Sequence, residues 1–194
     1  MCYAPAVRPS PSPFGGPPPV LGTARLLLRA LEPGDAAAVE AAVSDAAVAR
    51  QTLAIPHPYP PGAAAEFIAA TQGEWAAGKA VTWAVVTRGE GALVGAMLLR
   101  FAWPHRRAEL GYWIARPAWG RGIATEAARA VVAYAFDAFS LHRVEARRWV
   151  ANEASGRVLA KVGMRDEGVQ RGALWRDGEA HDVIVSGLLR DDPR

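Results

Sequence analysis

The stretch over residues 113–136, WIARPAWGRGIATEAARAVVAYAF, most constrains what this chain can fold into. An apolar run that favours a strand is followed by two closely spaced glycines and then by a long alanine-rich run that favours a helix. Glycine at positions 120 and 122 allows positive φ and lets main-chain N–H groups approach a ligand without a Cβ in the way. The sequence therefore predicts a sharp strand-to-helix turn.

The start of that helix is predicted to attract an anion. Ala124 and Thr125 lie in its first turn, where N–H groups have no intrahelical partner and the helix dipole is positive. Phosphate or pyrophosphate is the ligand that such a turn favours. Two known phosphate loops do not fit, because the GK[ST] ending of a P-loop is missing and GxGxxG would need glycine at position 125. On these residues alone, a purely structural turn is an equal alternative.

Length and composition indicate one folded domain. With 194 residues, 51% of them hydrophobic, the chain can bury a sizeable core and does not imply a second module. Residues 1–22 are rich in proline, glycine and serine, so they can neither form a regular hydrogen-bond ladder nor bury much surface. We predict a disordered extension over residues 1–22 and a folded domain over residues 23–190.

Charge, cysteine and histidine content exclude several classes of protein. The net charge of +3 and pI near 9.4 would suit a nucleic-acid-binding module, but the arginines are scattered among acidic residues, which predicts no specific nucleic-acid partner. The single cysteine, Cys2, lies in the predicted extension, and the four histidines are too dispersed for a metal site. No apolar run reaches membrane-spanning length. We predict a cytoplasmic protein without membrane contact or bound metal.

Hydrophobic periodicity and turn residues predict a mixed α+β domain. The predicted strands are 23–31, 81–87, 92–101, 109–115, 142–150, 164–175 and 179–189, and the predicted helices are 35–44, 63–77, 124–139 and 152–163. The proline-rich run over residues 51–62 is predicted to be a loop. This order predicts a central mixed, twisted sheet of about seven strands, with helices on both faces.

The order of elements, with the glycine loop after the fourth strand, resembles the acetyl-CoA-dependent N-acetyltransferases of the GNAT superfamily over nearly all of residues 24–189. Their pyrophosphate loop follows the pattern Arg/Gln-x-x-Gly-x-Gly/Ala, and the matching register here is WGRGIA at 119–124, with Trp119 as the departure. The segments TARLLLRAL, AELGYWIARPAWGRGIATEA, HRVEA and NEASGRVLAKVGM resemble in particular the ribosomal-protein-alanine N-acetyltransferase branch.

The resemblance implies two catalytic residues. Glu109 corresponds to the acidic residue that relatives use as a general base or amine anchor, directly or through water; the alternative is a solvated glutamate paired with Arg106 or Arg107. Ser155 corresponds to a hydroxyl that faces the CoA sulfur and gives or relays a proton to it; the alternative is a helix serine bonded only to backbone. Tyr112 or Tyr134 could replace Ser155, but both fit core positions better, Tyr112 on its strand and Tyr134 on the long helix.

The resemblance also implies a binding site for acetyl-CoA. Main-chain groups of residues 113–115 are expected to pair with the pantetheine arm, with one N–H as oxyanion donor, if the fourth and fifth strands separate beyond residue 115. Asn152 is expected to bond the same arm, and Arg121 and Lys161 either reach the CoA phosphates or remain solvated surface charges. The expected cofactor-binding set is Trp113, Ile114, Ala115, Trp119, Gly120, Arg121, Gly122, Ile123, Ala124, Thr125, Asn152 and Lys161.

The function implied is transfer of an acetyl group from acetyl-CoA to a primary amine, by direct attack through a tetrahedral intermediate. The acceptor could be a protein N-terminal α-amine or a small-molecule amine, and the chain a monomer or a homodimer. The proline loop with Tyr59 and the final hairpin with Trp175 are expected to wall the acceptor site. Alternatives are a non-catalytic acyl-CoA sensor on the same fold and, last, a basic nucleic-acid-binding module.

Overall fold

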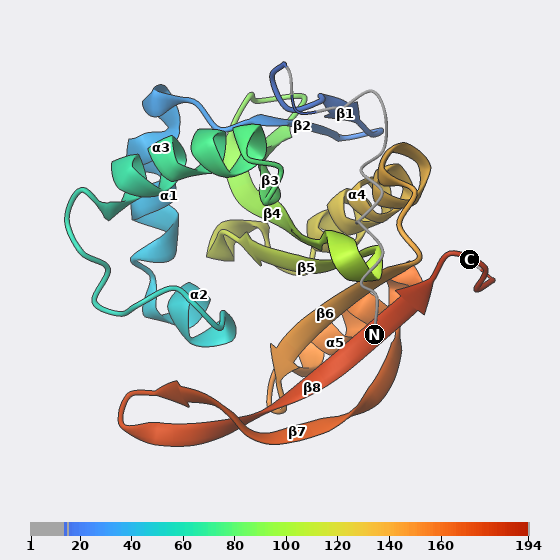
Figure 1. The fold of residues 1–194 in the computed structure, drawn as a ribbon. Coiled ribbons are helices and arrows are strands. Elements are labelled where there is room, and N and C mark those ends of the chain that lie inside the picture. Colours follow the sequence, from blue (N-terminus) through green and yellow to red (C-terminus); the bar gives the residue numbers. More distant parts are fainter. Residues whose placement is uncertain (1–13, 15, 194) are drawn as a thin grey trace.

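The chain folds around one mixed β-sheet. The structure is a computed structural model that describes Phe14 and residues 16–193, so residues 1–13 of the predicted extension lie outside the described part. Eight strands lie in the order β1-β2-β3-β4-β5-β6-β8-β7, and every neighbouring pair is antiparallel except β5 and β6 (Figure 1). The predicted α+β class is confirmed, with eight strands in place of about seven.

Every predicted strand and helix is present with slightly shifted ends, and β1 and α2 are additional. The strands are β1 (Leu21–Gly22), β2 (Leu26–Ala30), β3 (Ala80–Thr87), β4 (Leu93–Ala102), β5 (Arg107–Ile114), β6 (Arg143–Trp149), β7 (Arg165–Arg176) and β8 (Glu179–Leu189). The helices are α1 (Ala36–Val43), α2 (Ala46–Gln51), α3 (Ala63–Ala76), α4 (Ile123–Phe139) and α5 (Glu153–Val162). None of the helices in the described residues has the length and apolarity needed to span a membrane.

Helices cover both faces of the sheet, as predicted. α1, α2 and α3 pack on one face, where Val48 and Ile68 share a buried cluster with Trp113 of β5. α4 and α5 pack on the other face, where Phe136 shares a second and larger cluster with Leu110 of β5. Successive side chains of a strand point to opposite faces, so β5 contributes to both cores. Its odd-numbered side chains face α1 to α3, and its even-numbered side chains face α4 and α5.

The end of the predicted extension belongs to the fold. The indole N–H of Trp75 donates to the Gly16 carbonyl at 2.6 Å, and that of Trp83 donates to the Pro19 carbonyl at 2.8 Å. Leu21–Gly22 then pairs with β2 as the edge strand. The folded part therefore begins before the predicted boundary at residue 22. The proline and glycine content of this segment predicts disorder, but two buried indoles bind its carbonyls and its last two residues pair with β2.

β5 and β6 pair only where they begin. Residues 107–109 are in register with residues 143–145, and beyond Glu109 β5 stays paired only to β4 while β6 stays paired only to β8. The sheet therefore divides into two halves, visible in Figure 1 as two groups of strands with different directions. We call the unpaired stretch, residues 110–114 facing residues 146–149, the strand gap. The predicted separation of these two strands exists, but it begins after Glu109 instead of beyond residue 115.

The close approach of β4 and β5 beside the strand gap gives a test of the packing. A Cβ at Gly95 would lie 2.5 Å from the Trp113 carbonyl oxygen and 2.6 Å from Ile114 Cδ1. We expect Gly95→Ala to lower the free energy of unfolding, measured by urea denaturation, by about 1–3 kcal/mol because the ladder must open to admit the methyl group.

Gly73 provides the matched control, since it is exposed in the middle of α3 and a Cβ there would meet no atom within 4 Å. Gly73→Ala should raise stability by up to about 1 kcal/mol, the ordinary gain from removing a helical glycine. Equal effects of the two substitutions would contradict the packing described for β4 and β5.

Candidate active site

The glycine loop leaves a row of main-chain donors without acceptors. After β5 and a 3-10 turn (Arg116–Ala118), Gly120 and Gly122 adopt φ of 73° and 77°, and α4 begins at once. The first helical bond runs from the Glu126 N–H to the Gly122 carbonyl at 3.0 Å. Within the part of the chain that the structure describes, the N–H groups of residues 120–125 have no hydrogen-bond acceptor. Such a row of donors at a positive helix end suits a diphosphate.

The turn between β1 and β2 holds this loop in place through Glu126 of α4. The Glu126 carboxylate accepts hydrogen bonds from the Thr23 hydroxyl at 2.6 Å and from the Arg25 main-chain N–H at 2.9 Å, and it forms an ion pair with the Arg25 guanidinium at 2.6 Å. Arg25 also donates to the Arg121 carbonyl at 3.0 Å. Burial raises the pKa of Glu126, but the bonds from Thr23 and Arg25 outweigh it and bring this pKa below its ordinary value. The anchoring carboxylate is therefore ionised at neutral pH.

A cavity of about 640 Å³ lies beside the loop and is lined by three basic residues, of which Arg25 is already paired with Glu126. Lys161, predicted to contact phosphate, lines it together with Gly122, Thr125 and Arg129. Arg129 is absent from the predicted set, although it follows Thr125 by one helical turn, a spacing that could have identified it. The Arg129 guanidinium donates to the main-chain carbonyl of Lys161 at 2.8 Å, which fixes the Arg129 side chain at the end of α5. Arg121 is exposed on the loop.

Only one of the three residues predicted to pair with pantetheine faces the strand gap. The Ala115 N–H donates to the Val94 carbonyl at 2.8 Å, and Trp113 is in register with Ala96 of β4. Main-chain groups of a strand alternate in direction, so Trp113 and Ala115 face β4, whereas Ile114 faces the gap. The prediction is thus wrong for the main chains of residues 113 and 115. The same alternation directs the Tyr112 N–H into the gap.

Trp119 replaces the usual Arg or Gln of the loop pattern and occupies one of the gap's main-chain acceptors. Its indole N–H donates to the Ile114 carbonyl at 2.7 Å, while 41% of the residue remains exposed. Because the Ile114 carbonyl is used in this bond, the Ile114 N–H is the main-chain group of that residue that a ligand in the gap can bind. The bond also ties the loop to the end of β5, so the donors of residues 120–125 are held at a fixed position relative to the strand gap.

Glu109 lies where the strand gap closes. Arg147 of β6 donates to both carboxylate oxygens of Glu109, at 3.1 and 2.6 Å, and this bond raises the pKa of Arg147. The predicted alternative partners are incorrect, because Arg107 instead pairs with Glu145 at 3.1 Å and Arg106 donates to the main chain of the α4–β6 connection. A carboxylate has about four lone-pair positions, so Glu109 can still accept a hydrogen bond from an incoming amine.

Ser155 and Tyr112 form a hydroxyl pair on the opposite face. Their oxygens lie 2.8 Å apart, and the Ser155 N–H donates to Oδ1 of Asn152, the N-cap of α5, at 2.9 Å. Burial raises the pKa of the Tyr112 phenol, so it stays protonated at neutral pH. The side-chain amide nitrogen Nδ2 of Asn152 donates to the Gln51 carbonyl at 3.0 Å. Ser155 therefore has a side-chain partner, and Asn152 has protein partners at both ends of its amide.

A buried arginine supports this hydroxyl pair. Arg148 is 9% exposed, and a Cβ at Gly156, the residue after Ser155, would lie 2.9 Å from its Cζ. Its guanidinium pairs with Asp166 at 2.8 Å. The positive charge of Arg148 favours the ionised form of Tyr112 and would equally favour an anion held by the two hydroxyls.

The strand gap lies between the Glu109–Arg147 pair on one face of the sheet and the Tyr112–Ser155 pair on the other. Glu109 is odd-numbered and faces the α1–α3 side, whereas Tyr112 is even-numbered and faces the α4–α5 side. Tyr112 is three residues further along β5, which corresponds to roughly 10 Å. A molecule lying in the gap can therefore present one side to the carboxylate and the other side to the hydroxyl pair. Within the described residues, no three His, Cys, Asp or Glu side chains are arranged to hold a metal ion.

A sheet split in this way, with a diphosphate-type loop leading from the gap to a helix, is the arrangement that the GNAT resemblance implies. The family model described as an acetyltransferase (GNAT) domain matches residues 25–165. The chain thus belongs to the GNAT acetyltransferase family and is an N-acetyltransferase that uses acetyl-CoA.

Known relatives agree with this assignment. The chain is 32% identical over 173 residues to the N-acetyltransferase YoaA of Bacillus subtilis, covering 89% of this chain and 97% of that protein. It superposes on a GNAT-family acetyltransferase from Bacillus anthracis with a TM-score of 0.80 at 27% identity, over 90% of this chain and 100% of the other. It is also 32% identical over 83 residues, 43% of each chain, to the [Ribosomal protein uS5]-alanine N-acetyltransferase of Escherichia coli.

Proposed function

We propose that this acetyltransferase acetylates a primary amine by direct attack on the thioester of acetyl-CoA. A bond forms between the amine nitrogen and the carbonyl carbon, and the carbonyl oxygen becomes an oxyanion. Collapse of this tetrahedral intermediate breaks the C–S bond and releases CoA as a thiolate. The amine loses one proton and the thiolate gains one. The proposal rests on the strand gap, which has a carboxylate at its closed end on one face and a hydroxyl pair on the other.

The diphosphate of acetyl-CoA is proposed to lie on the main-chain N–H groups of residues 120–125, with Lys161 and Arg129 taking a further phosphate. The pantetheine arm then runs along β5 through the strand gap. The N–H groups of Tyr112 and Ile114 are the candidates for binding this arm and for stabilising the oxyanion, since both face the gap. Asn152 keeps one amide hydrogen for the arm, because only one of its two is used by Gln51.

Glu109 is proposed to orient the amine and to accept its proton, directly or through a water. An α-amine has a pKa of about 8 and a lysine amine about 10.4, so an α-amine loses its proton more readily. This difference favours an N-terminal α-amine or another weakly basic amine as the acceptor. The relative named for acetylating alanine of ribosomal protein uS5 supports the same choice. A cytoplasmic location and the choice between monomer and homodimer stay predictions of the sequence.

Ser155 and Tyr112 are proposed to supply the proton that the sulfur gains, and water restores the proton of Tyr112 after CoA leaves. Ser155 donates to the thiolate, and Tyr112 donates in turn to Ser155 along the 2.8 Å contact between their oxygens. Arg148 and the positive end of α5 lower the cost of the developing negative charge. Tyr112, which the sequence analysis placed in the core, thus has a proposed role in the reaction.

Release of the CoA thiol on a panel of amines tests the proposed function. The panel contains peptides with a free N-terminus, N-blocked peptides with one lysine, amino acids, polyamines and aminoglycosides. We expect turnover with at least one amine. Glu109→Gln should lower kcat/KM for that amine about 10²–10⁴-fold, the usual contribution of a positioned acid or base, while binding of acetyl-CoA is retained.

Glu145→Gln is the matched control, because Glu145 is in register with Glu109 but pairs with Arg107 and Arg143. Stabilisation by acetyl-CoA without turnover on any amine would identify a sensor and reject the proposed reaction. Full activity of Glu109→Gln would remove Glu109 from the mechanism.

Substitution of the hydroxyl pair tests the proton donor separately. Ser155→Ala and Tyr112→Phe should each lower kcat about 10–100-fold with KM for acetyl-CoA little changed, and the double variant should be no worse than the poorer single variant because the two hydroxyls act in series. Tyr134→Phe serves as the control, since Tyr134 packs among aromatic side chains of the α4 core. Wild-type kcat in both single variants, or additive losses in the double variant, would rule out the relay.

A further inference from the structure

Residues 49–55, here called the acceptor rim, cross the open end of the strand gap. α2 packs against β5, and its N-cap residue Asp45 lies 3.7 Å from Arg116, just beyond the end of β5. At the other end of α2, the Thr52 carbonyl accepts a hydrogen bond of 2.9 Å from the indole of Trp149, the last residue of β6. Trp149 is odd-numbered and faces the same side as Arg147 and Glu109. α2 and the acceptor rim together therefore contact both strands of the gap, on the face that Glu109 shares.

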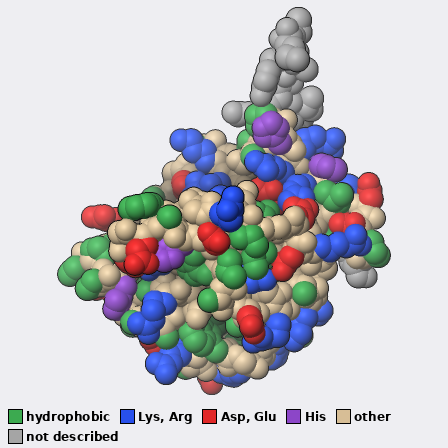
Figure 2. All heavy atoms as spheres, turned by 90° about the horizontal axis from the view of Figure 1, so that it is seen from below, with side chains coloured by type: hydrophobic (Ala, Val, Ile, Leu, Met, Phe, Trp, Pro, Cys, Tyr) green, Lys and Arg blue, Asp and Glu red, His purple; other side chains and the backbone are tan. Residues whose placement is uncertain are grey.

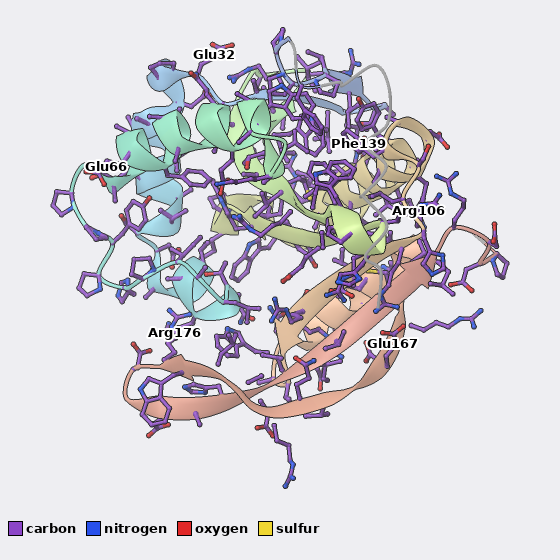
Figure 3. All side chains as sticks on the ribbon, in the orientation of Figure 1. Glu32, Glu66, Arg106, Phe139, Glu167 and Arg176 are labelled. Atoms are coloured by element: carbon purple, nitrogen blue, oxygen red, sulfur yellow. The ribbon has the colours of Figure 1, made fainter. Side chains whose placement is uncertain are left out.

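Arg176, the last residue of β7, binds three carbonyls of the acceptor rim. Its guanidinium donates to the carbonyl oxygens of Ala49, Thr52 and Ile55 at 3.3, 2.6 and 3.0 Å. Ala49 lies in the last turn of α2 and Thr52 is its C-cap residue, so a cation bound here complements the negative end of the helix dipole. Figure 3 shows Arg176 between the tip of the β7–β8 hairpin and α2.

Burial and contact with the Trp149 ring also restrict the movement of the Arg176 side chain. It is only 17% exposed, and its Cζ lies 5.9 Å from the centroid of the Trp149 ring. The two side chains share the Thr52 carbonyl as an acceptor. A planar guanidinium stacked on an indole loses little freedom when it binds several carbonyls, so it sets their positions more closely than a lysine would.

Asn152 connects the acceptor rim to the proposed proton donor. One end of its amide holds the Gln51 carbonyl and the other end holds the main-chain N–H of Ser155. The loop that faces the amine and the residue proposed to face the sulfur are thus bound to one side chain. A shift of the acceptor rim would therefore also move Asn152 and, through it, Ser155.

We infer that Arg176 is a positioning residue for the acceptor amine, an inference that rests on the proposed function. The amine approaches Glu109 past the acceptor rim, and Arg176 holds that rim at the end of α2 and at the start of the proline loop. Without Arg176 the rim loses three hydrogen bonds and shifts relative to Glu109. The diphosphate loop leads into α4, on the other face of the sheet, and among the described residues Arg176 makes no bond to it, so the proposed grip on the phosphates of acetyl-CoA is spared.

Steady-state kinetics of Arg176→Ala test this inference with the amine that serves best in the panel. We expect kcat/KM for the amine to fall roughly tenfold or more, as displaced reacting groups do, with KM for acetyl-CoA within about twofold of wild type. Arg171→Ala is the matched control, since Arg171 lies exposed on the same strand and makes none of these bonds. Arg176→Lys should recover only part of the loss.

Trypsin cleavage after Arg50 gives a second readout that does not depend on activity. Arg50 is exposed near the end of α2, so release of the acceptor rim should speed cleavage there in Arg176→Ala and leave it unchanged in Arg171→Ala. Wild-type amine kinetics, an equal loss for amine and acetyl-CoA, or unchanged cleavage after Arg50 would each overturn the inference while leaving the proposed function intact. Failure of the wild-type protein to acetylate any amine would reject both.

Discussion

The structure depends on the point where β5 and β6 stop pairing. Each strand has a partner on its outer side, β4 for β5 and β8 for β6, so the two halves of the sheet remain stable after the strands part. Glu109 and Arg147 form an ion pair across the two strands just where the register ends. The main-chain groups of residues 110–114 that face β6 are thereby freed from the ladder, and a buried polar group without a partner is costly. A ligand that forms hydrogen bonds with these main-chain groups, as a neighbouring strand would, removes that cost.

Side chains that cross between distant parts of the chain fix the surroundings of this gap. Arg25 and Glu126 tie the β1–β2 turn to the glycine loop, Trp119 ties the loop to β5, and Arg176 ties the C-terminal hairpin to the end of α2. The arginines therefore act mainly as cross-links within the fold. On the face shown in Figure 2, basic and acidic side chains are interspersed.

The sequence allowed prediction of the elements whose hydrophobic period is clear, and of the glycine loop, because glycine spacing at a strand-to-helix junction is a local signal. It did not predict α2, a six-residue helix stabilised by the Asp45 cap and by Arg176 from a distant strand. Nor did it predict that Glu109 pairs with Arg147, since the partner of a strand residue depends on a register that only the folded sheet sets. The direction of the main chain at Trp113 and Ala115 depends on the same register.

The central claim is that the N–H groups of residues 120–125 bind the diphosphate of acetyl-CoA while the strand gap takes its pantetheine arm. The most direct measurement is the amide NMR spectrum of the protein titrated with CoA and, separately, with pantetheine, which lacks the diphosphate. The account predicts that CoA shifts the amide signals of residues 120–125 and of Tyr112 and Ile114, and that pantetheine shifts only the latter two. Saturable binding of CoA that leaves residues 120–125 unshifted would contradict it.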